Sequence, residues 1–118
     1  MFNDTVLDHF KNPRNAGDLP DATYTVEVTN PVCGDILRIA VRWEECRVST
    51  VRFKTQGCVA AIASSSVLTE LLIGRSAPEI REITPQKISE SLGGLPPATF
   101  HAAQLCSDGV AALLSKLS

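Results

Sequence analysis

From residue 23 onward the sequence changes its hydrophobic period once, at Gly57, and that change limits the folds open to the chain. Before it, apolar and polar residues alternate over 23–30, 35–43 and 47–56, as they do in half-buried β-strands. After it, apolar residues recur every three or four positions, as in helices that cover a sheet. Strands followed by helices predict an α+β fold. We expect a small three-stranded antiparallel sheet covered on one face by helices, and a helical C-terminal half.

Proline and glycine residues divide the helical part into segments. A long helix is predicted over 58–74, ending at Gly74, and shorter helices over 77–83 and 84–94. Pro96 and Pro97 predict an extended connector over 95–100, because a proline disfavours helix in the residue before it. The last helix is predicted over 101–117. One more short helix is predicted at the N-terminus, ending before Pro13.

Length and composition predict one globular domain, residues 1–118. The chain is 44% hydrophobic with a net charge of −2, which gives no reason to expect nucleic acid or an acidic membrane as a partner. No apolar run is long enough to span a membrane, and the N-terminus has no signal-peptide pattern. We therefore expect a cytoplasmic protein with reduced thiols, in which four cysteines favour metal or sulfur chemistry over disulfides.

Two cysteines and one histidine lie where loops meet regular structure. Cys33 follows a proline turn and precedes Asp35 by two residues, while Cys58 opens a helix, where unpaired N–H groups stabilise negative charge. His101 stands where the proline-rich connector enters the last helix. Thiolates with an imidazole and a carboxylate suit zinc, ferrous iron or an iron–sulfur cluster.

Each of these residues also has a structural interpretation. Asp35 could serve only as a turn former, and His101 only as a helix cap. Cys106 is either a small buried helix residue or a fifth metal ligand. For Cys46, in the predicted hairpin turn, a structural or incidental role is favoured.

Other reactive side chains give weaker signals. His9 is expected at the surface or in an interface, not as a ligand. The serines at 64–66 are expected to permit close helix packing. A Cys–His hydrolase or transferase with Cys58 or Cys33 as nucleophile is a third hypothesis, without a substrate-pocket motif to support it.

Four motifs, in order, resemble the IscU/NifU N-terminal family of iron–sulfur cluster assembly scaffolds. They are "DHFKNPRNAG", "NPVCGD", "FKTQGCVAAIASSS" and "LPPATFH". The resemblance runs from Thr5 to Leu117. It implies an α+β fold and a scaffold or carrier, not an enzyme. Such a protein accepts sulfur from a cysteine desulfurase, binds iron, and transiently holds a [2Fe–2S] cluster before passing it to apo acceptor proteins.

The resemblance also implies roles for individual residues. Cys33 and Cys58 would be cluster thiolates and sulfur acceptors, Asp35 the nearby carboxylate that ligates metal or keeps the cluster labile, and His101 the histidine ligand. A homodimer bridged by the cluster is compatible with this set. The alternative is a degenerate member that binds zinc through the same four residues and acts as a sulfur acceptor or regulatory partner of a desulfurase.

Two departures from the family pattern bear on these roles. The family's third cysteine normally follows the histidine directly, but that position is Ala102 here. Cys106 lies about 40° round and roughly 6 Å along an ideal helix from it, and is retained as a candidate metal ligand. The chaperone-docking segment, Leu-Pro-Pro-Val-Lys in the family, ends in Ala98 and Thr99 here, which argues against recognition by a dedicated Hsp70-type chaperone.

Overall fold

Three strands form one antiparallel sheet in the computed structural model, which describes residues 2–117. The strands are β1 (Tyr24–Thr29), β2 (Ile36–Glu44) and β3 (Arg47–Gln56), in the spatial order β1-β2-β3. Val26 pairs with Ile39, which pairs with Phe53, so one face of the sheet carries a continuous apolar stripe. The predicted hairpin and its third strand are confirmed.

The helices are α1 (Asp4–Lys11), α2 (Val59–Leu72), α3 (Ala77–Arg81), α4 (Pro85–Ser91) and α5 (His101–Leu117). Sequence signals explain where several of them begin. The side chain of Asn3 accepts a hydrogen bond from the N–H of Val6 at the start of α1, and that of Thr84 accepts one from Lys87 at the start of α4. The connector predicted as extended differs in part, because it contains a 3₁₀ turn, η1 (Pro97–Thr99).

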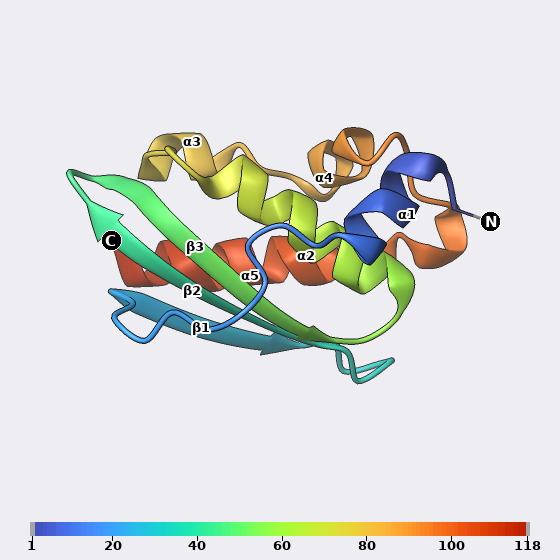
Figure 1. The fold of residues 1–118 in the computed structure, drawn as a ribbon, viewed down its shortest axis with the longest axis horizontal. Coiled ribbons are helices and arrows are strands. Elements are labelled where there is room, and N and C mark those ends of the chain that lie inside the picture. The colour runs from blue at the N-terminus through green and yellow to red at the C-terminus, as the bar shows by residue number, and fades with distance from the viewer. Residues whose placement is uncertain (1, 118) are drawn as a thin grey trace.

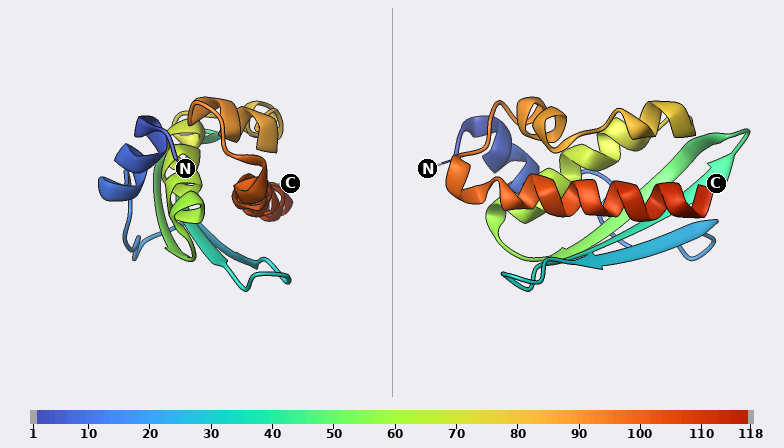
Figure 2. Two further views of the ribbon diagram at one scale, coloured as in Figure 1. Left: turned by 90° about the vertical axis from the view of Figure 1, so that its right-hand side faces the viewer. Right: turned by 180° about the vertical axis from the view of Figure 1, so that it is seen from behind.

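Two helices lie against the apolar face of the sheet, α2 over β3 and α5 along β1 and β2 (Figures 1 and 2). The packing of α5 is close, since a Cβ atom on Gly109 would lie 3.0 Å from methyl carbons of Leu37 and Ile39. Of the shorter helices, α1 packs against α2, and α4 packs against both α2 and α5. The core therefore lies between one sheet face and a helical layer, as the α+β prediction requires.

The segment between α1 and β1 crosses the other face of the sheet (Figure 1). Its backbone bonds to β3, with the N–H of Phe53 donating to Asn15 and the N–H of Gly17 donating to Phe53. Ion pairs fix it further, between Asp18 and Lys54 and between Asp21 and Arg42.

Among the helices that the structure describes, none combines the length and hydropathy needed to cross a membrane.

Candidate metal centre

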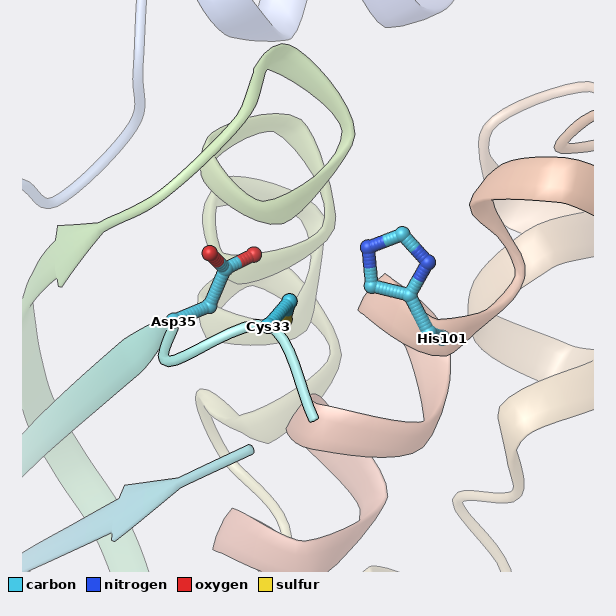
Figure 3. Close-up of side chains that lie close together, drawn as sticks. All are labelled: Cys33, Asp35 and His101. Atoms are coloured by element: carbon cyan, nitrogen blue, oxygen red, sulfur yellow. The ribbon is translucent and has the colours of Figure 1, made fainter. Parts of the chain in front are cut away.

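Three predicted ligands converge at one end of the molecule. A thiol sulfur of Cys33, a carboxylate oxygen of Asp35 and an imidazole nitrogen of His101 all lie within 4.8 Å of one another. In Figure 3, Cys33 stands between the carboxylate and the ring. The side chains come from segments 66 residues apart, so the tertiary fold brings them together.

The local structure explains how each side chain arrives there. Cys33 and Asp35 belong to the tight connection between β1 and β2, in which Gly34 has a φ of +78°. Such a conformation favours glycine, and it turns the chain so that Asp35 directly precedes β2. His101 begins α5 directly after the turn η1, which leads the chain into the helix.

The fourth candidate ligand, Cys58, does not belong to the group of atoms within 4.8 Å, but its sulfur lies beside Asp35. The sulfur of Cys58 lies 3.9 Å from Oδ2 of Asp35, within reach of a weak S–H···O hydrogen bond. Cys58 is the N-cap residue of α2, and its side chain makes no capping hydrogen bond there. Its thiol is exposed, so it is accessible to a metal ion.

Gly57 makes room for the carboxylate. A Cβ atom at this position would lie 2.8 Å from Cγ of Asp35 and 3.0 Å from Cβ of Ala61. Real Cβ atoms essentially never lie closer than 3.0 Å to another atom, so a side chain at position 57 would push the Asp35 carboxylate out of its place beside the start of α2. This role was missed from the sequence, although a glycine directly before a helix-opening cysteine was a signal that could have indicated it.

The cluster lies at the protein surface. Cys33 and Cys58 are exposed, and Asp35 and His101 are half-buried. A cavity of about 510 Å³ lies between the sheet and the crossing segment, but none of the four candidate ligands lines it. Two thiols, a carboxylate and an imidazole at a surface can bind a soft metal ion or a cluster and release it again.

Cys106, a further predicted ligand, is not among the residues that this cluster brings together. The residue is fully buried, and so is Ala102, one turn before it. Burial raises the pKa of the Cys106 thiol to about 12, an effect opposed by its hydrogen bond with Ser65. Because the side chain is enclosed between α5 and its neighbours and faces away from solvent, we interpret Cys106 as a small packing residue.

His9 is buried, and the prediction of a surface position for it was wrong. Its side chain lies under the contact between α1 and α2, with Nδ1 2.8 Å from Oγ of Ser66 and Nε2 3.5 Å from Oε1 of Glu70. Burial, the largest effect, lowers the pKa of His9, and the nearby Arg14 lowers it further. Glu70 acts in the opposite direction, but its half-exposed carboxylate is screened by water.

The remaining reactive residues considered in the sequence, the serines at 64–66 and Cys46, lie outside the candidate metal centre. The serines at 64–66 are all buried in α2, as close packing requires. Ser65 and Ser66 have hydrogen-bond partners, whereas Oγ of Ser64 has none among the described residues. Cys46 is exposed in the β2–β3 turn, and the ligand cluster does not include it.

Comparison with known proteins gives a consistent result. Residues 1–117 match the family described as NifU-like N terminal domain. An iron–sulfur cluster assembly scaffold protein IscU of Archaeoglobus fulgidus is 43% identical over 110 residues, which cover 93% of this chain and 72% of that protein. The scaffold protein IscU of Azotobacter vinelandii is 40% identical over 116 residues, covering 94% of this chain and 89% of that protein.

Solved structures share the fold. The N-terminal part of a nitrogen-fixing NifU-like protein from Brucella abortus superposes with a TM-score of 0.66 at 20% identity, covering 98% of this chain and 84% of that one. A scaffold protein of the SUF system from Fervidobacterium islandicum gives 0.65 at 18% identity, covering 96% and 87%. With its match over residues 1–117 and its relatives at 40% identity and above, the chain belongs to the NifU-like N-terminal domain family.

Proposed function

We propose that the protein is a scaffold for iron–sulfur cluster assembly, which holds a [2Fe–2S] cluster and hands it on. The observation that carries this proposal is the convergence of Cys33, Asp35 and His101 within 4.8 Å at the surface, in a chain whose relatives are named as such scaffolds. Cys58, in contact with Asp35, completes a set of four donors.

Four donors match what a [2Fe–2S] cluster needs, since each iron takes two terminal ligands from the protein. Cys33 and Cys58 would supply thiolates, His101 a nitrogen and Asp35 an oxygen. A carboxylate is a harder ligand than a thiolate and binds this kind of cluster less firmly. The bond between the cluster and Asp35 would therefore break first, which suits a protein that has to release its cluster.

Sulfur would arrive from a cysteine desulfurase as a persulfide. A thiolate of Cys33 or Cys58 would attack the terminal sulfur, form a new S–S bond, and release the desulfurase cysteine as a thiolate. Reduction of the transferred sulfur to sulfide takes two further electrons from an electron donor. The chain would thus relay sulfur and iron to apo acceptor proteins without turning over a small molecule, and its free thiols suit the reducing cytoplasm.

A dedicated Hsp70-type chaperone is not included among the proposed partners. The segment that docks it in the family ends in Ala98 and Thr99 here, and both lie in the turn η1 beside His101.

Zinc binding is the second candidate function. The observation that favours it is the same donor set, because two sulfurs, one nitrogen and one oxygen are ligands that zinc accepts in tetrahedral geometry. A zinc-bound form would serve as a sulfur acceptor or as a regulatory partner of a desulfurase.

Anaerobic reconstitution with ferrous iron and sulfide separates the two functions. A scaffold should develop visible absorption, with about two irons and two sulfides per cluster, and should pass them to an apo ferredoxin. Stoichiometric zinc that iron and sulfide do not displace, with no visible absorption, would overturn the scaffold function in favour of the zinc protein.

A further inference from the structure

Four hydrogen bonds tie the loop that carries Cys33 to one residue, Asn30. The side-chain Oδ1 of Asn30 accepts the N–H of Val32 at 2.9 Å and, more weakly, that of Cys33 at 3.4 Å. The backbone C=O of Asn30 accepts the N–H of Gly34 at 2.8 Å, and its N–H donates to the C=O of Asp35 at 2.8 Å.

These contacts account for every backbone donor at the tip of the loop. Pro31 has no N–H, and the N–H groups of the next three residues all point to Asn30. The bond to Asp35 closes the loop at its far end. Side-chain packing adds little, because Val32 is 94% exposed and Cys33 is exposed as well.

We propose that Asn30 is a positioning residue for the metal centre, which fixes the Cys33 thiol and the Asp35 carboxylate opposite His101. The inference rests on the proposed function and adds to it a residue that is not a ligand. Two of the four bonds belong to the Asn30 side chain, so its removal frees the tip without breaking the two backbone bonds. The thiol then samples several positions, and each binding event has to immobilise it again.

Variants at this position separate the acceptor oxygen from the size of the side chain. Asn30→Asp keeps an oxygen at the same distance from the backbone and should preserve the loop. Asn30→Ala removes the oxygen, and Asn30→Gln moves it away by one methylene group. Both should weaken binding of Co²⁺, used as a spectroscopic probe for the thiolate site, by about tenfold.

Thr23→Ala is the matched control, because Thr23 holds the opposite end of β1 in the same way. Its Oγ1 accepts the N–H of Trp43 at 2.9 Å in an exposed position. The control should lose about as much thermal stability as Asn30→Ala but bind Co²⁺ as the unmodified protein does.

The experiment is an anaerobic titration of the apo protein with Co²⁺, followed by thiolate-to-cobalt absorption, together with thermal unfolding of every variant. Weaker binding in the Ala and Gln variants, with Asn30→Asp close to the unmodified protein, supports the inference. Equal binding by all three variants overturns it, and leaves the proposed function intact as long as Cys58→Ser still loses cobalt. If Asn30→Ala does not fold, the comparison of Asp with Gln decides. No cobalt–thiolate absorption in the unmodified protein would contradict the proposed site itself.

Discussion

The carboxylate of Asp35 occupies the space that a side chain on Gly57 would need, with Cγ 2.8 Å from the position of the missing Cβ. The two residues are 22 positions apart in the sequence. The end of β3 and the β1–β2 loop therefore have to come this close together in the fold. The absence of a side chain at position 57 thus makes room for a candidate ligand.

Gly57→Ala should displace Asp35 and weaken binding of Co²⁺ or zinc by about tenfold or more, as loss of supporting groups at metal sites does. The measurement is an anaerobic metal titration. A double-mutant cycle supplies the control, since Gly57→Ala should have little further effect once Asp35→Ala has removed the carboxylate. An equal loss in both backgrounds would assign the effect to the contact with Ala61 instead.

Cys33→Ser and Cys58→Ser should each abolish retention of the cluster, because no other thiol of the described residues lies in the cluster to replace either one. Cys46→Ser is the control, with an exposed cysteine outside the cluster. Iron and sulfide are measured after anaerobic reconstitution and gel filtration. Retention by Cys58→Ser together with loss in Cys46→Ser would place the site elsewhere.

Cys106→Ala should leave metal binding unchanged and lower the free energy of unfolding by about 1 kcal/mol, the cost of a small cavity where a sulfur atom was packed. Metal stoichiometry and chemical denaturation of the same sample check both parts. Loss of metal in this variant at unchanged stability would show that the thiol turns toward the site when metal is bound.

The apo protein should lose stability as the pH falls below about 6.5, the ordinary pKa of histidine. The pKa of His9 is lowered in the folded protein, so between the two pKa values the unfolded chain binds the extra proton and is favoured. The stabilisation is complete above pH 6.5 and is lost as the pH falls through the lowered value.

Denaturant unfolding at pH 7.5 and 5.5 measures this effect, with His9→Gln as the comparison. The variant should be less stable at pH 7.5 and should show a smaller change between the two pH values. An identical pH dependence in both proteins would exclude His9 as its source.

Much of this architecture follows from the sequence, because periods of two and of three to four residues are local signals. Alternation in 35–43 indicated that Leu37 faces the core and Arg38 does not, and both positions are as expected. The candidate ligands Cys33, Asp35 and His101 could be named from local chemistry and from the family resemblance. Their convergence within 4.8 Å depends on strand register and helix packing, which no local pattern contains.

What the sequence did not indicate has the same physical origin. The sequence of α1 gave no sign that His9 meets Ser66, which lies 57 residues away in α2. For Cys106, ideal helix geometry gave the correct offset from position 102 but not the direction of that face. The structure buries both Ala102 and Cys106 in the core. Whether that face of α5 points to the core or to the candidate site depends on how the helix is rotated over the sheet.

The four candidate ligands lie on three separate parts of the chain: the β1–β2 loop, the start of α2 and the start of α5. Cargo held by all of them would act as a removable cross-link between sheet and helices. By thermodynamic linkage, free cargo at a hundred times its dissociation constant would add about 2.7 kcal/mol to the folded state. Delivery of the cargo would remove that stabilisation, so the protein without cargo should be less stable than the loaded protein. Its amide hydrogens should exchange faster, and the largest increase is expected at the start of α5.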